Sequence, residues 1–158
     1  VDLDNLSCLK ELATNFTPDI FSLDIDGIDY YVADEILENG FRPKIFITEY
    51  NSAFGPKESI TVKYSKNFIC ENMHPSHLYF GVSLNGWKNF FKKHGYTFIT
   101  NDSNGVNCFF VDPKYFKKSF LQNIKSTDYI ENKYFLKKFN GNYKKQFQNI
   151  KKFPFVKI

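Results

Sequence analysis

The segments Phe21-Ser-Leu-Asp-Ile-Asp26 and Ile45-Phe-Ile-Thr-Glu49-Tyr50-Asn51 decide the fold that we expect for this chain. Each begins as a short run of β-branched and aromatic residues and ends in acidic or amide side chains, which is typical of a buried strand that stops at a polar edge. In open α/β sheets the ligand crevice lies at the carboxyl ends of the strands. We therefore expect two neighbouring strands that deliver their oxygen-bearing side chains to one site.

The residues between these strands have the pattern of a helix. Asp29 stands where it can cap a helix, the apolar residues after it repeat at helical spacing, and Asn39-Gly40 is a typical helix end. A strand, a helix and a second strand form a βαβ unit, whose crossover makes the strands parallel. A further helix, capped by Asp4, is expected from Asn5 to about Asn15.

The middle of the chain predicts a second helix and a hairpin. Residues 83–94 are amphipathic and end at Gly95, and strands at 96–100 and 107–111 are joined by an Asn-Gly turn that makes them antiparallel. Between residues 51 and 83 we expect a strand at 60–64 and otherwise a lid or binding loop. Residues 113–158 alternate Lys and Asn with Phe and Tyr, which predicts one or two surface helices.

Together these elements predict an α/β fold with parallel strands, an antiparallel C-terminal hairpin and helices on the faces of the sheet. Residues 1–122 form the expected α/β domain, and residues 123–158 form a basic, aromatic-rich extension. The chain has 158 residues, 19% of them aromatic, which is enough for one domain with a core.

Composition also limits location and partners. No apolar run approaches the roughly 20 residues that span a bilayer, and no signal peptide is evident, so we expect a cytoplasmic location and no membrane partner. Cys8, Cys70 and Cys108 are odd in number and widely spaced, which favours reduced thiols. The net charge of +4 comes mainly from lysines after residue 113, and because arginine is nearly absent, a solvated helical face is favoured over nucleic-acid binding.

Four motifs carry a resemblance to a known family. They are Leu23-Asp-Ile-Asp-Gly-Ile-Asp-Tyr30, Ile47-Thr-Glu-Tyr-Asn51 with Phe54-Gly-Pro56, Tyr79-Phe-Gly-Val-Ser83, and Ser103-Asn-Gly-Val-Asn-Cys-Phe-Phe-Val111. In this order they resemble the C-terminal half of FkbM-like, S-adenosylmethionine-dependent methyltransferases, over about residues 20–115.

The resemblance implies a class I, Rossmann-like methyltransferase fold with strand order 3-2-1-4-5-7-6, of which this chain supplies strands four to seven. It implies O-methylation of a small hydroxyl-bearing acceptor, such as a sugar of a glycan, with S-adenosylmethionine as cofactor. That family binds the cofactor through a glycine-rich loop after strand one, whereas the eight glycines here are isolated. We therefore expect a fragment whose cofactor-binding half is missing and which is inactive alone.

The acidic strand ends supply the candidate site residues. Methyl transfer to a hydroxyl requires removal of its proton, and carboxylate oxygens are the ligands that Mg²⁺ prefers. The candidates for acid, base or metal chemistry are Asp24, Asp26 and Glu49, with Asn51 as a further ligand for Mg²⁺. The candidates for acceptor contacts are Asp29, Tyr30, Tyr50 and Asn51. In the structural alternative, Asp26 and Asp29 cap the following helix and Glu49 pairs with a lysine.

Other interpretations remain open at this point. Cys70, His74 and His77 have a spacing that suits Zn²⁺, although no fourth ligand is evident. The chain is alternatively a catalytically inactive, methyltransferase-like interaction module that forms a homo-oligomer through an exposed sheet edge. A third reading takes Asp24-Ile-Asp26 as the acid pair of a metal-dependent glycosyltransferase.

Overall fold

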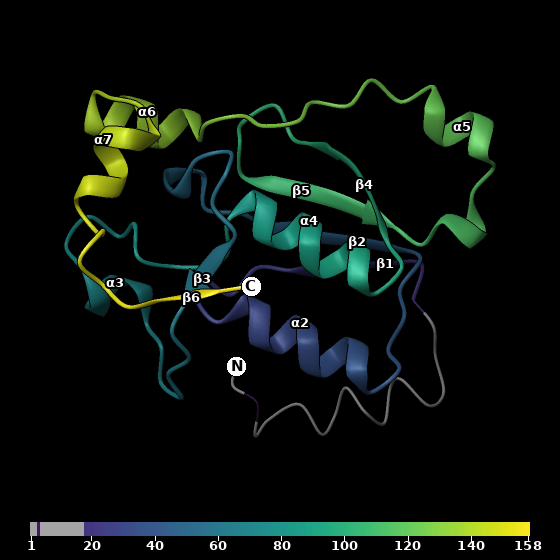
Figure 1. The fold of residues 1–158 in the computed structure, drawn as a ribbon, viewed down its shortest axis with the longest axis horizontal. Helices are drawn as coiled ribbons and strands as arrows, with labels where there is room; N and C mark the ends of the chain where they lie inside the picture. Colours follow the sequence, from purple (N-terminus) through teal and green to yellow (C-terminus); the bar gives the residue numbers. More distant parts are fainter. Residues whose placement is uncertain (1–2, 4–17) are drawn as a thin grey trace.

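A four-stranded sheet organises the fold of this computed structural model, which describes Leu3 and residues 18–158 (Figure 1). The strands, in spatial order, are β1 (Ile20–Leu23), β2 (Ile45–Glu49), β5 (Asn107–Val111) and β4 (Thr97–Asn101). β1 and β2 are parallel, whereas β5 runs antiparallel to both β2 and β4. The predicted parallel pair and antiparallel hairpin are thus confirmed within a mixed α/β fold. The helix expected at residues 5–15 lies outside the described residues.

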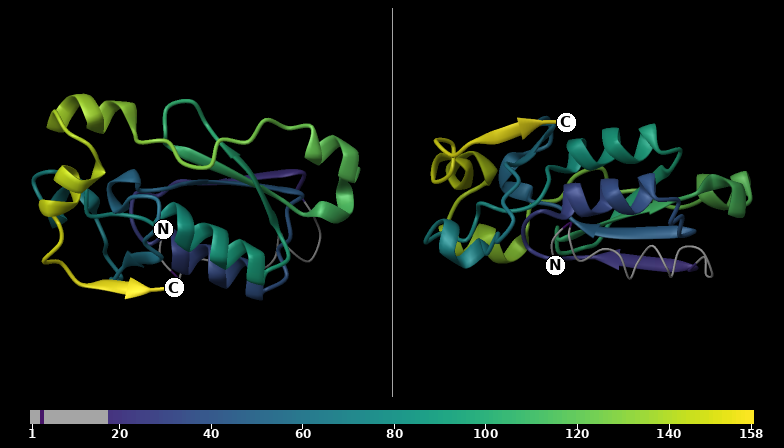
Figure 2. Two further views of the ribbon diagram at one scale, coloured as in Figure 1. Left: turned by 45° about the horizontal axis from the view of Figure 1, so that its top comes forward. Right: turned by 90° about the horizontal axis from the view of Figure 1, so that it is seen from below.

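Two ten-residue helices, α2 (Asp29–Glu38) and α4 (Leu84–Lys93), lie side by side on one face of the sheet (Figure 2). The side chain of Ser83 caps α4 by accepting a hydrogen bond from the Gly86 N–H. The helices bury aromatic side chains against the sheet, and the rings of Phe91 and Phe110 stack with their centroids 4.2 Å apart. This contact fixes α4 against the middle of the sheet.

Residues 51–83, where we expected a lid or binding loop beside a strand at 60–64, contribute to a second hydrophobic core. They form η2 (Ser52–Phe54), β3 (Ile60–Val62) and the short α3 (Cys70–Met73). Phe54, Leu78 and Tyr79 are buried there together with Ile150 from the end of the chain. The apolar side chains of this segment are buried in the second core. Its strand β3 therefore does not need to join the four-stranded sheet.

The C-terminal part of the chain closes this second core and is not confined to surface helices. It comprises η3 (Pro113–Tyr115), α5 (Lys118–Gln122), α6 (Lys133–Phe139), α7 (Tyr143–Gln148) and β6 (Phe155–Lys157). β6 pairs antiparallel with β3, and Gln146 and Ile150 are fully buried. α5 projects at the opposite end of the molecule from α6 and α7 (Figure 1). Of the described helices, none has the length and apolar character needed to cross a bilayer.

Candidate functional site

Three predicted carboxylates meet at the carboxyl ends of β1 and β2. Asp24 and Asp26 follow β1, Glu49 is the last residue of β2, and one oxygen from each of the three lies within 4.8 Å of the others. The parallel pairing of β1 with β2 causes this, because it brings both carboxyl ends to the same edge. Alternation along β2 turns Glu49 to the face opposite the buried Thr48. The structure therefore brings Asp24, Asp26 and Glu49 together.

The turn that carries Asp26 is held by the buried carboxylate of Asp29. Its two oxygens accept hydrogen bonds from the Ile25 N–H at 3.1 Å and the Gly27 N–H at 2.9 Å. Asp26 itself has a left-handed backbone with φ 51°, which aspartate tolerates better than most residues. A Cβ on Gly27 would lie 2.4 Å from the Phe68 ring, so the turn is also confined from outside. The position of Asp26 is consequently set by its neighbours.

Electrostatics make Glu49 the unusual member of the group. Burial, followed by the charges of Asp24 and Asp26, raises the pKa of Glu49 to about 9. Burial also raises the pKa of Asp26, with smaller contributions from Asp24 and Glu71. Among the described residues, no cation lies within ion-pair distance of Glu49 and none donates a hydrogen bond to its carboxyl, so the expected alternative of a lysine partner is not seen. At neutral pH Glu49 holds a proton unless a bound cation replaces it.

A cavity of about 210 Å³ opens beside these carboxylates. Its walls come from the strand ends, from the segment around α3 and from α6; the lining residues are Asp26, Glu49, Cys70, Glu71, His77, Phe80, Tyr134, Phe135 and Lys138. Lys138 brings a positive charge to the rim and donates a hydrogen bond to the Ser76 carbonyl at 3.4 Å. Burial raises the pKa of the Cys70 thiol to about 12, so it is protonated and a poor nucleophile. The sequence carried no spacing signal for the α6 residues, because they lie far along the chain in a pattern typical of a solvated helix.

Two of the predicted acceptor contacts, Tyr50 and Asn51, have buried structural roles instead, and Tyr50 is part of the main core. The Tyr50 hydroxyl donates to the Ile130 carbonyl at 2.6 Å. The Asn51 side chain donates to the carbonyls of Leu78 and Phe80 and accepts from the Ala53 N–H. Both side chains are 1% exposed. Their polar groups therefore hold the loop after β2, and Asn51 does not join the carboxylates as an ion ligand.

Asp29 and Tyr30 are placed away from the cavity as well. Asp29 is the first residue of α2 and binds the preceding turn, while the N-cap position belongs to Ile28, so the expected capping role is corrected. The Tyr30 ring packs edge-on against Phe90, between α2 and α4. A position near the end of a strand did not by itself distinguish Asp29 and Tyr30, which have structural roles, from the three carboxylates that meet at the edge of the sheet.

The spacing of Cys70, His74 and His77 does not produce a zinc site. The Cys70 thiol donates to the His77 carbonyl, and the His74 ring nitrogen Nδ1 contacts Ser76 Oγ at 2.7 Å. Within residues 18–158, three-residue groups with metal-ligand geometry occur at Asp24, Asp26 and Glu49 and at a separate cluster on α2 and α4.

Comparison of the chain with protein-family models, with curated proteins and with solved structures gives no match. The fold and the site thus define the class: a mixed α/β protein with a carboxylate cluster at the carboxyl ends of two parallel strands. Any more particular assignment depends on the motifs and the geometry of this chain itself.

Proposed function

We propose that this chain forms part of an S-adenosylmethionine-dependent methyltransferase that methylates a hydroxyl of a small acceptor, such as a glycan sugar. The observation that carries the proposal is the meeting of Asp24, Asp26 and Glu49 beside a cavity of about 210 Å³. These residues belong to two of the four FkbM-like motifs. A volume of this size accommodates one sugar ring more readily than a polymer.

The sheet topology supports the proposal. In a class I methyltransferase sheet, strand seven is antiparallel and lies between strands five and six. Here β5 is antiparallel and lies between β2 and β4, so the order β1-β2-β5-β4 agrees with strands four, five, seven and six. The hydrophobic pattern of the hairpin does not by itself predict that β5 lies between β2 and β4.

The carboxylates suit proton removal from the acceptor. Asp26 lines the cavity, whereas Asp24 is not among the lining residues, and Asp26 is therefore assigned as the base that accepts the hydroxyl proton. Glu49, protonated at neutral pH, donates a hydrogen bond that orients the acceptor oxygen. The all-oxygen donor set also fits Mg²⁺, and Asp24, Asp26 and Glu49 would hold it. When bound, such an ion lowers the pKa of the acceptor hydroxyl.

The described residues do not form a cradle for the cofactor. The glycine after β1, Gly27, is isolated and lies against the Phe68 ring, whereas a nucleotide-binding turn needs several glycines that let the backbone approach the ligand. The proposal therefore assigns acceptor binding and proton transfer to this chain, and no step of it uses a cofactor contact here.

A methyl-transfer assay tests the proposal. The full-length protein is incubated with methyl-labelled S-adenosylmethionine and a panel of monosaccharides and glycans, and labelled product is counted. We expect Asp26→Asn to lower turnover at least about 100-fold, the scale of a lost general base. Glu58→Gln, an exposed acid outside the cavity, is the matched control and should leave turnover unchanged. Equal turnover in wild type and Asp26→Asn would refute the assignment.

The unpaired edge of β1 favours a second candidate function, in which the chain is an interaction module. Within the described chain β1 pairs with β2 on one side only, and its first residue, Ile20, is 57% exposed. A short uncharged edge strand of this kind invites pairing with another chain. Sedimentation velocity would support this candidate if the chain is dimeric and Ile20→Lys makes it monomeric. A monomer at high concentration would exclude self-association through this edge.

A further inference from the structure

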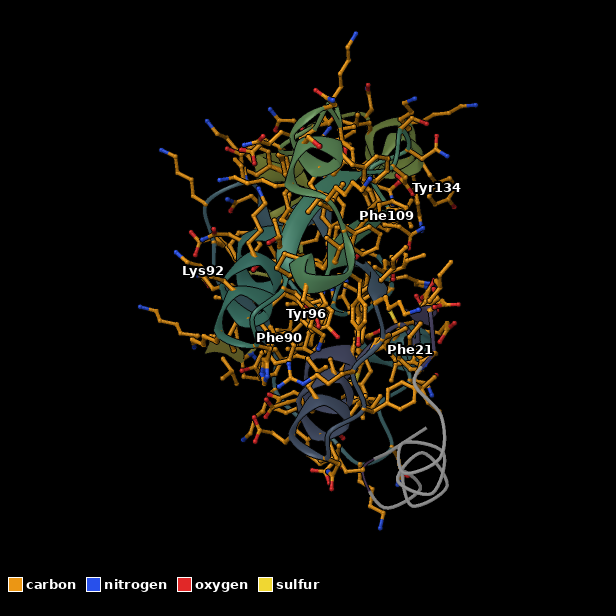
Figure 3. The ribbon with its side chains drawn as sticks, turned by 90° about the vertical axis from the view of Figure 1, so that its right-hand side faces the viewer. Phe21, Phe90, Lys92, Tyr96, Phe109 and Tyr134 are labelled. Carbon is orange, nitrogen blue, oxygen red and sulfur yellow. The ribbon has the colours of Figure 1, made fainter. Side chains whose placement is uncertain are left out.

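A second cluster of metal-ligating side chains lies at the other end of the helical layer. Asp34 and Glu38 come from α2 and His94 follows the last residue of α4, and one ligand atom from each lies within 4.8 Å of the others. His94 Nε2 is 3.7 Å from Asp34 Oδ1, and His94 Nδ1 is 3.9 Å from Glu38 Oε1. Figure 3 looks onto this end of the molecule, with Phe90 and Lys92 of α4 labelled. The cluster is therefore separate from the acidic cavity, which lies where the two helices begin.

The three side chains are held in register by the fold. Asp34 and Glu38 are four residues apart on one helix, so they occupy the same face one turn apart. The His94 ring packs against Phe90 at 4.6 Å between centroids, and its side chain is only 12% exposed. The His94 carbonyl accepts a hydrogen bond from Arg42 at 2.7 Å, which fixes the backbone there. The imidazole is thus oriented toward the two carboxylates before any ligand arrives.

The C-terminus of α2 adds a second feature that attracts a cation. α2 has no basic residue in its last turn and carries Glu38 there, although a helix C-terminus favours positive charge. α4 ends at the same place, but its last turn already carries Lys92 and Lys93, so this feature belongs to α2 alone. Among the described residues, His94 is the one ion-pair partner of Asp34 and Glu38. The Arg42 guanidinium donates to a carbonyl and makes no ion pair with either acid in the part of the chain that the structure describes.

We propose that His94, Asp34 and Glu38 bind a zinc ion that joins the C-terminal ends of α2 and α4. One imidazole nitrogen with two carboxylate oxygens is a donor set that suits Zn²⁺, whereas Mg²⁺ prefers oxygen alone. Bonds of about 2.0–2.2 Å in a tetrahedral site place the ligand atoms roughly 3.3–3.6 Å apart, so atoms that now lie within 4.8 Å of one another must approach by at most about 1.5 Å. The carboxylates can make this movement, because the side chains of Asp34 and Glu38 are 49% and 70% exposed.

Thermal unfolding with added metal tests the site. All chains carry Glu49→Gln, which weakens the acidic cavity as a competing ion site. At a zinc concentration a hundredfold above the dissociation constant we expect Tm to rise by roughly 5–10 °C, the scale for a chain of this size. The same concentration of Mg²⁺ should leave Tm unchanged. His94→Ala should abolish the zinc response, and His74→Ala, which changes a histidine outside the cluster, should retain it.

The zinc measurements give results that would overturn the proposal as well as results that support it. An absent zinc response in the parent chain, or an equal response in His94→Ala, would overturn the proposal. If His94→Ala does not fold, Glu38→Gln decides instead, because its side chain is at the surface; it should weaken zinc binding at least about tenfold. Visible absorption of bound Co²⁺ gives an independent readout, which we expect in the parent chain and not in Glu38→Gln at matched concentration. Identical Co²⁺ spectra in the two chains would also contradict the site.

Discussion

The carboxyl groups of Asp26 and Glu49 lie within 4.8 Å of each other at the ends of two parallel strands. Burial and the neighbouring acids raise the pKa of Glu49 to about 9, so Glu49 holds a proton at neutral pH. Like-charged groups this close in a partly dry site do not both ionise without a compensating cation. The chemistry that we propose for the site, proton transfer with or without Mg²⁺, follows from this relationship.

The first prediction concerns stability against pH in Glu49→Gln. The folded-state pKa of Glu49 lies above the unfolded value of 4.5, so the folded chain holds a proton that the unfolded chain loses between pH 4.5 and 9. The free energy of unfolding of the wild type should therefore fall as pH rises through this window. Glu49→Gln lacks this fall and should be more stable than wild type at pH 8 by at least about 1 kcal/mol.

Urea unfolding at pH 3 and pH 8 measures the effect. The two chains should have nearly equal stability at pH 3, which is below the unfolded-state pKa of 4.5, so Glu49 is neutral in both the folded and the unfolded state. Glu58→Gln, at an exposed position, is the control for a change of charge elsewhere. Wild type and Glu49→Gln with the same stability at pH 8 would show that Glu49 titrates normally.

The second prediction concerns ion binding in the cavity, followed with Mn²⁺ as a paramagnetic substitute for Mg²⁺. Binding requires Glu49 to lose its proton, so affinity should rise up to about tenfold per pH unit between pH 6 and pH 8. Glu49→Gln should bind weakly and without this pH dependence. His94→Ala is the matched control for the second cluster and should keep the wild-type profile. Affinity that stays constant over this range would argue against a cation bound by Glu49.

The third prediction concerns Asp29, which holds the turn that carries Asp26. Asp29→Ala leaves the buried N–H groups of Ile25 and Gly27 without their carboxylate acceptor, which should cost about 2–4 kcal/mol of unfolding free energy. Asp29→Asn keeps one acceptor oxygen and should cost less. Urea unfolding gives both values. If Asp29→Ala is as stable as wild type, the turn is not held in the way described.

Much of the fold could be predicted because local pattern and global packing agree. The strand over Ile45–Glu49, the helix over Leu84–Lys93 and the hairpin closed by Gly105 each carry their own periodicity and end signals. The insertion of β5 between β2 and β4 is different, because a hairpin pattern does not say which of its strands meets the rest of the sheet. That order followed only from the family resemblance.

The site was less predictable than the fold. The expectation that Asp24, Asp26 and Glu49 meet rested on the parallel pairing of the strands, which brings both carboxyl ends to one edge. The left-handed turn at Asp26, beyond the end of β1, has no such signal in the sequence. Tyr50 and Asn51 stand just past the strand, where alternation no longer says which way a side chain turns. Both are buried, and Tyr50 is part of the main core. Lys138 could not be found, because its approach to the cavity depends on how the C-terminal segment returns over the second core.

The fourth prediction tests whether Asn51 is structural. Asn51→Ala removes an amide that binds the carbonyls of Leu78 and Phe80, so it should cost about 1–3 kcal/mol of unfolding free energy. Its affinity for Mn²⁺ should stay within about twofold of wild type, because the amide is not an ion ligand. The exposed Asn67→Ala is the control for stability. A large loss of Mn²⁺ affinity with unchanged stability would restore the ligand role expected from the sequence.

A carbon-detected NMR titration of the Glu49 carboxyl tests the shared carboxylate site most directly. We expect a midpoint near pH 9 in the wild type, a lower midpoint in Asp26→Asn, and a lower midpoint again when Mg²⁺ is added. A midpoint near 4.5 that neither the substitution nor the ion moves would contradict the account.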